Sequence, residues 1–156
     1  MHYIITAIGC KVNQYEAQAI ETLLHAHGFT AAADGEPVDL IVVNTCAVTA
    51  EAVRKAKQEI RRLRRDHPDA ALIVTGCAAQ IAPEKWAAIA GVERVIGNAD
   101  KLKPETWAAL DAPPAPVTDI MAATETAAHL VTEFAGRARA FVQVQNGCDH
   151  RCTFCV

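Results

Sequence analysis

Short apolar runs that alternate with helix-like patterns constrain the fold of this chain more than any other feature of its sequence. Residues 40–45 and 71–76 are almost continuously apolar, and residues 3–8 and 92–96 are apolar and partly β-branched. Strands of this composition are buried on both faces, as in parallel sheets. Segments with helical periodicity separate them, which indicates repeated strand–helix–strand units with right-handed crossovers. The predicted fold class is therefore α/β, with an open parallel sheet in a three-layer domain.

Four segments between and after these runs are predicted to be helical. In the first, Asn13 is the predicted N-cap, Glu16 completes a capping box with it, and Gly28 ends the helix. The second is predicted to begin after Thr49 as its N-cap and to run to about residue 66. The other two predicted helices cover residues 83–89 and 102–110.

A proline-rich segment divides the chain. Residues 111–116 read Asp-Ala-Pro-Pro-Ala-Pro, which is typical of a linker. We expect a first domain over residues 1–110, a linker over 111–139 and the start of a second domain over 140–156. Residues 140–145 form the first predicted strand of that second domain, which the resemblance described below identifies as a barrel.

Composition limits the possible classes of protein. The chain has 156 residues, of which 51% are hydrophobic and 21% charged, so wholesale disorder is excluded. No apolar run approaches the roughly 20 residues of a membrane span, and the first residues do not resemble a secretory leader. We therefore expect a cytoplasmic protein without a membrane partner. The formal net charge of −3 gives no global field that favours or opposes nucleic acid.

Three cysteines each follow a predicted strand. Cys10, Cys46 and Cys77 come directly after the runs that end near residues 8, 45 and 76. The carboxyl ends of parallel strands share one edge of the sheet, where open α/β folds bind their ligands. The sequence predicts that these thiols converge on a shared metal or cluster site. Separate burial of each cysteine as a small apolar side chain is the alternative.

The other three cysteines form a compact motif. Cys148, Cys152 and Cys155 have C-x3-C-x2-C spacing in a predicted loop. Three close thiolates suit an iron–sulfur cluster or zinc. On a four-iron cluster they leave one iron open to chelate a small molecule. His150 offers the alternative of a zinc site with three cysteines and one histidine.

Both cysteine sets resemble motifs of one family. The C-x3-C-x2-C motif with Phe154 resembles that of radical S-adenosylmethionine enzymes. Residues 9–16 (GCKVNQYE), 44–49 (NTCAVT) and 75–77 (TGC) resemble the N-terminal domain of the methylthiotransferases. Residues 11–16 are most similar to the branch that acts on N6-threonylcarbamoyladenosine in tRNA. The isopentenyladenosine branch and the branch that modifies a ribosomal-protein aspartate look less similar.

This resemblance implies two [4Fe-4S] clusters. One would be held by Cys10, Cys46 and Cys77, and its open iron would carry the sulfur to be inserted. The other would be held by Cys148, Cys152 and Cys155 and would bind S-adenosyl-L-methionine, with Phe154 packed near that cofactor.

The resemblance also implies a reaction and its partners. The substrate would be a tRNA whose modified adenosine beside the anticodon receives a methylthio group at C2 through radical chemistry. A reductant protein such as flavodoxin or ferredoxin would supply electrons. The family pattern continues beyond Val156 into a barrel and an RNA-binding domain, so we expect a truncated chain that is inactive alone.

A basic helix is a candidate for tRNA contact. Seven of the fifteen basic residues fall on the helix predicted after Thr49, and its apolar stripe should turn them outward. They form either a solvated face or a surface that contacts phosphates. These residues are Arg54, Lys55, Lys57, Arg61, Arg62, Arg64 and Arg65.

Two other classes of function stay open from the residues alone. The first is an electron-transfer module with two clusters, although such carriers usually give each cluster four cysteines. The second is a nucleotide-binding α/β domain with structural zinc, although the sequence lacks a G-x-G-x-x-G or P-loop motif.

Overall fold

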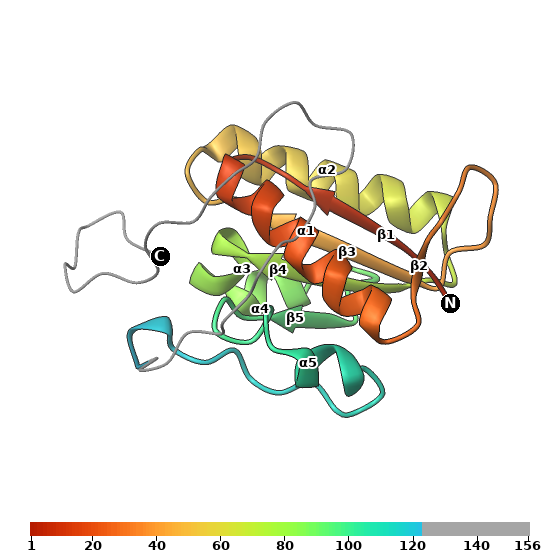
Figure 1. Ribbon diagram of the computed structural model, residues 1–156. Helices are drawn as coiled ribbons and strands as arrows, with labels where there is room; N and C mark the ends of the chain where they lie inside the picture. Colours follow the sequence, from red (N-terminus) through yellow and green to blue (C-terminus); the bar gives the residue numbers. More distant parts are fainter. Residues whose placement is uncertain (123–156) are drawn as a thin grey trace.

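A five-stranded parallel sheet forms the centre of the computed structural model, which describes residues 1–122 (Figure 1). The strand order is β2-β1-β3-β4-β5, and every neighbouring pair is parallel. This confirms the predicted α/β class. The strands are β1 (His2–Ala7), β2 (Thr30–Ala31), β3 (Leu40–Thr45), β4 (Ala71–Gly76) and β5 (Arg94–Ile96).

Helices cover both faces of this sheet. After β1 the chain moves to one side, to β2, whereas from β3 onward it moves to the other side, so right-handed crossovers put the helices on opposite faces. The buried residues of α1 and α5 pack on one face, and those of α2, α3 and α4 pack on the other (Figure 1). The helices are α1 (Lys11–Ala26), α2 (Ala50–Asp66), α3 (Cys77–Ile81), α4 (Pro83–Ala87) and α5 (Pro104–Ala108), followed by a 3-10 turn at Ile120–Ala122.

Alternate side chains of the buried strands serve the two faces. In β3, Ile41 and Val43 pack with the α2 side, whereas Leu40 and Val42 pack with the α1 side. All six residues of β3 are buried, which explains its continuous apolar sequence. The two tryptophans, Trp86 and Trp107, fill the two cores at 3% and 2% exposure. None of the helices in the described residues combines the length and apolar character that a membrane crossing requires.

Several predicted boundaries agree with the structure, and the start of the first helix does not. Thr49 caps α2, since its Oγ1 accepts a hydrogen bond from the Ala52 amide, and Gly28 has a φ of +83° just after α1. However, α1 begins at Lys11 with Cys10 as N-cap. Asn13 therefore lies inside the helix, fully buried, and the predicted capping box is wrong. The short strand β2 and the short helix α3 were not predicted from the sequence.

Residues beyond the predicted domain boundary at 110 contact the sheet domain. The Arg94 guanidinium donates to the carbonyls of Leu110 and Ala112, and the Gln80 amide donates to the carbonyl of Thr118 at 2.9 Å. Val117 packs against the core on the α2 side. The boundaries at 110, 139 and 156 stay predictions, because residues 140–156 and most of the expected linker lie outside the described residues.

The phenol of Tyr3 gives a prediction for stability at high pH. Burial, aided by the charge of Glu21, raises the pKa of Tyr3 from 10.0 to about 12. The folded state therefore holds this proton more tightly than the unfolded chain does. The resulting stabilisation is complete below pH 10 and is lost as the pH rises toward 12.

Urea unfolding of the wild type and of Tyr3→Phe, measured at about pH 9 and about pH 11, tests this link. We expect the phenylalanine variant to lose less unfolding free energy over this interval, because it has no phenol to ionise. Equal losses in the two proteins would contradict the predicted shift.

Candidate metal centre

The three cysteines of the described chain follow three adjacent strands. Cys10 comes after β1, Cys46 directly after β3 and Cys77 directly after β4. Thr45 pairs with Gly76 in the sheet, so Cys46 and Cys77 succeed residues that lie side by side. Because β1 pairs with β3 through Ala7 and Asn44, the loop that carries Cys10 leaves at the same edge. We call Cys10, Cys46 and Cys77 the cysteine centre.

Each thiol of the cysteine centre has a distinct local setting. Cys10 is the N-cap of α1, and its Sγ lies 3.5 Å from Asn13 Oδ1, to which it donates. Cys46 is 2% exposed, and its Sγ accepts from the Val48 amide at 3.5 Å. Cys77 is the first residue of α3 and is partly buried, as is Cys10. All three are free thiols.

The Cys77 thiol senses the charges of its neighbours. Burial raises the pKa of the Cys77 thiol, while the Lys101 ammonium acts in the opposite direction. Glu16, Cys10 and Cys46 each add to the rise. The thiols of the other two loops are thus near enough for their charge to act on Cys77.

Buried polar side chains tie the cysteine-bearing loops together. The Asn13 amide donates to the carbonyls of Ile8 and Thr45, both at 2.9 Å. The hydroxyl of Thr45 donates to the Thr75 carbonyl at 2.6 Å, and that of Thr75 donates to the Ile96 carbonyl at 2.7 Å. These bonds satisfy carbonyls at the ends of the strands. We call Asn13, Thr45 and Thr75 the edge network.

Two glycines allow the loops to approach one another. Gly9 has a φ of +105°, and a Cβ built on it would lie 2.7 Å from the Sγ of Cys46. Gly76 has a φ of +95°, and its Cβ would lie 2.3 Å from the carbonyl oxygen of Thr45. Both positions need a residue without a side chain, for conformation and for space. The glycines before Cys10 and Cys77 thus hold the cysteine centre close to the sheet.

The donor set of the cysteine centre fits an iron–sulfur cluster. Within residues 1–122, no three His, Cys, Asp or Glu side chains are arranged to hold a single metal ion. A four-iron cluster keeps its ligand sulfurs farther apart than one tetrahedral ion does, and thiolates are its usual ligands. Three thiols on neighbouring loops that are coupled but not closed around one point are compatible with the larger group. The assignment of these residues as ligands stays a prediction.

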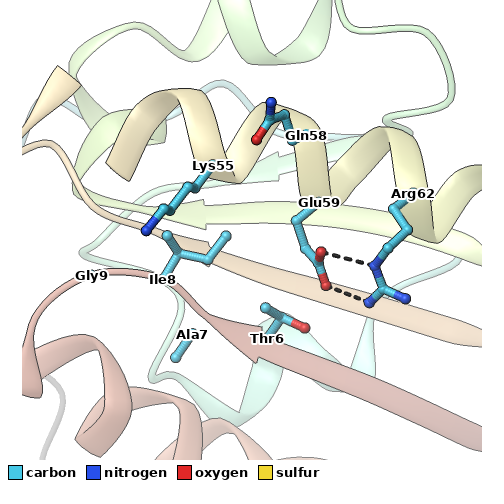
Figure 2. A pocket seen from close by; sticks show the side chains of 8 residues that line it. All are labelled: Thr6, Ala7, Ile8, Gly9, Lys55, Gln58, Glu59 and Arg62. Carbon is cyan, nitrogen blue, oxygen red and sulfur yellow. Dashed lines mark hydrogen bonds and ion pairs between the residues drawn. The ribbon is translucent and has the colours of Figure 1, made fainter. Parts of the chain in front are cut away.

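An open cleft leads to this edge from the α2 side. It has a volume of about 460 Å³ and lies between the end of β1 and α2, as Figure 2 shows. Ile4 of β1 and Ile8 just after it pack against the core on this face, beside α2. The cleft reaches Gly9, where an added Cβ would meet the side chain of Cys46. Its lining residues are Thr6, Ala7, Ile8, Gly9, Lys55, Gln58, Glu59 and Arg62.

The wall formed by α2 is basic, but several of its charges already have partners. Arg62 makes a bidentate pair with Glu59, at 3.0 and 2.6 Å, which lowers the pKa of that carboxyl (Figure 2). Arg64 is used differently from the prediction, because it donates to the carbonyls of Pro68, Ala70 and Gly91.

Arg54 and Lys55 pair with Glu51 at 2.6 and 3.8 Å, and the other basic residues of α2 are divided between packing and solvent. The Lys57 ammonium lies 5.7 Å from the ring centroid of Trp86. Arg61 and Arg65 are exposed; in the described part of the chain Arg61 makes no ion pair, and Arg65 contacts Asp66 at 3.6 Å. The outward basic surface predicted from the sequence is therefore present, although smaller than seven charges.

Sequence reasoning missed a second set of polar residues at this edge. Lys101 is 1% exposed, and its ammonium lies 2.7 Å from Glu16 Oε2 and 2.8 Å from Asn98 Oδ1. Asn44, fully buried, donates to the Asn13 carbonyl at 3.1 Å. Asn44 had a visible signal, a polar residue at the end of an apolar strand just before a cysteine. Lys101 had none, because nothing in its neighbourhood marks a lysine as buried.

Comparison with known proteins identifies the class to which this fold and its strand-end cysteines belong. A family model described as "Uncharacterized protein family UPF0004" matches residues 2–97. The match spans β1 to β5 and includes all three residues of the cysteine centre. The chain belongs to this family.

Curated relatives extend the similarity over almost the whole chain. It is 43% identical to a threonylcarbamoyladenosine tRNA methylthiotransferase MtaB of Rickettsia prowazekii, over 97% of this chain and 34% of the relative. It is 38% identical to the MtaB protein of Bacillus subtilis, over 96% and 34%. A tRNA-2-methylthio-N(6)-dimethylallyladenosine synthase of Novosphingobium aromaticivorans is 36% identical, over 97% and 35%. The chain spans about a third of the length of these relatives.

Gly76 offers a test of the geometry at the cysteine centre. In Gly76→Ala, the methyl group meets backbone atoms of Thr45 in addition to the positive φ, so we expect a loss of more than about 3 kcal/mol of unfolding free energy. Gly35→Ala is the matched control, because Gly35 has a similar φ of +85° and open space around it. We expect that control to lose only about 1 kcal/mol.

Chemical denaturation of both variants measures the difference. Similar losses for Gly76→Ala and Gly35→Ala would contradict the close approach of β4 to the end of β3.

Proposed function

We propose that this chain is the part of a tRNA methylthiotransferase that holds a [4Fe-4S] cluster on Cys10, Cys46 and Cys77. The observation that carries the proposal is the succession of these cysteines after three adjacent parallel strands, β1, β3 and β4. Residues that follow such strands gather at the ligand-binding edge of open α/β folds. The names of the curated relatives support the class of enzyme.

The chain's own residues have defined tasks in this proposal. The three thiolates bind the cluster, and the edge network orients the loops that carry them. Gly9 keeps the Cys10 loop against Cys46. Such clusters, together with S-adenosyl-L-methionine, supply the radical and sulfur-transfer chemistry that amino-acid side chains lack. We propose Cys148, Cys152 and Cys155 as ligands of a second cluster, with Phe154 beside it.

The proposed substrate is the adenosine next to the anticodon of a tRNA, modified as N6-threonylcarbamoyladenosine. The two most identical of the relatives named above carry that base in their names. The dimethylallyladenosine enzyme follows at 36%, so the exact base rests on a small difference in identity. A reductant such as flavodoxin or ferredoxin and a cytoplasmic location complete the proposal.

Iron content after anaerobic reconstitution with iron and sulfide tests the ligand assignment. We expect about eight iron atoms per chain, and about four in Cys10→Ala/Cys46→Ala/Cys77→Ala. The corresponding variant of Cys148, Cys152 and Cys155 should also keep about four. Circular dichroism of each variant checks that the sheet domain still folds.

Two results would contradict the proposed ligands. The first is an iron content that does not change when the cysteine centre is removed from a folded chain. The second is stoichiometric zinc without iron in anaerobic preparations, which would favour a structural zinc domain.

The exposed arginines of α2 provide a test for tRNA binding. We expect Arg61→Gln/Arg65→Gln to weaken binding of tRNA several-fold and to reduce the log–log salt slope by up to about 2, because each arginine would neutralise one phosphate. The measurement is fluorescence anisotropy of labelled tRNA over a series of salt concentrations. Lys85→Gln/Lys103→Gln removes the same charge elsewhere on the surface and should leave the slope unchanged. Equal effects of the two double variants would rule out a specific contact by α2.

A further inference from the structure

A buried cation lies behind the cysteine centre. The Lys101 side chain is 2% exposed, and its ammonium is 2.7 Å from Glu16 Oε2 and 2.8 Å from Asn98 Oδ1. An ammonium has three donors, so one N–H has no partner within residues 1–122. Burial of a charge is unfavourable unless partners compensate it, and here one carboxylate and one amide oxygen do so.

The position of this charge is fixed from several elements. The backbone carbonyl of Lys101 accepts from the indole of the buried Trp107 at 2.8 Å, and its amide donates to the Gly97 carbonyl at 3.0 Å. Glu16 comes from α1 and also accepts from Asn44 in β3 at 3.3 Å. The ion pair thus joins α1, β3 and the loop after β5. An ammonium held this firmly keeps its position when a neighbouring group changes its own charge.

The ion pair is close to the loops of the cysteine centre. Glu16 lies on the helix that Cys10 caps, and Asn44 is two residues before Cys46. Asn44 also links this pair to the third cysteine, because it donates to Glu16 and lies against Gly76, the residue before Cys77.

We propose that the buried ammonium of Lys101, paired with Glu16, stabilises negative charge on a group bound by the cysteine centre and is a positioning residue of that centre. The inference rests on the proposed function, in which this group is a four-iron cluster. One electron from dithionite makes such a cluster more negative by one charge. A nearby cation therefore favours the reduced state, and a nearby anion favours the oxidised state.

Two single substitutions should move the reduction potential in opposite directions. Lys101→Met leaves the negative charge of Glu16 without its partner, so the ratio of reduced to oxidised cluster at a fixed potential should fall about tenfold. For one electron, this corresponds to a reduction potential lower by about 59 mV. Glu16→Gln leaves Lys101 uncompensated and should raise this ratio. Lys101→Arg keeps the charge and should stay near the wild-type value. Lys103→Met, two residues away in the same loop, is the matched control and should change nothing.

The experiment uses the whole 156-residue chain with Cys148, Cys152 and Cys155 changed to alanine, so that only the cysteine centre takes up iron. Reconstituted protein is titrated with dithionite, and the reduced cluster is followed by electron paramagnetic resonance. If Lys101→Met does not fold, Glu16→Gln and the double variant Lys101→Met/Glu16→Gln still decide. The double variant leaves no buried charge unpaired and should fall between the two single variants.

The outcomes separate this inference from the proposed function. Opposite shifts for Lys101→Met and Glu16→Gln support a direct electrostatic role. Shifts of the same sign, or none in a chain that binds iron normally, would overturn the role of Lys101 and leave the cluster site standing. If the chain with Cys148, Cys152 and Cys155 changed to alanine takes up no iron, both the role of Lys101 and the proposed cluster site are overturned.

Discussion

Hydrogen bonds from buried side chains to strand-end carbonyls are the interactions on which the carboxyl edge of this sheet depends. Asn13, Thr45 and Thr75 donate hydrogen bonds to carbonyls at or just beyond the ends of the strands. A buried polar group left without its partner costs about 1–3 kcal/mol, so each of these bonds restricts the loop that follows. The loops so restricted are the ones that carry the cysteines. The position of the thiols is therefore determined by polar contacts one layer beneath them.

The sheet was predictable because burial on both faces leaves a plain pattern. The bounds of β3 and β4 agree with the apolar runs at residues 40–45 and 71–76. The first helix was less predictable, since Asn13 followed by Glu16 fits a capping box locally. In the folded chain the Asn13 amide is recruited by carbonyls of β3 and the preceding loop, and Cys10 becomes the cap. Tertiary contacts thus override a local signal.

The candidate site also has a part that the sequence predicts and a part that it does not. Topology alone predicts that cysteines after parallel strands share one edge, and in the structure all three cysteines follow adjacent parallel strands. Lys101 could not be predicted, because its burial depends on Glu16, 85 residues earlier in the chain. A lysine in a loop is normally exposed. Only the meeting of α1 with the loop after β5 creates a partner for it.

The arrangement of the helices explains why the cysteine centre is approached from one side. The strand order reverses between β1 and β3, so α1 lies on one face while α2 covers β3 and β4 on the other. On the α2 side, a cleft lies between the end of β1 and α2 and reaches Gly9. On the opposite face, α1 packs on the sheet and carries Glu16, which pairs with Lys101. The buried charge of Lys101 therefore acts from within the protein, where solvent and salt screen it least.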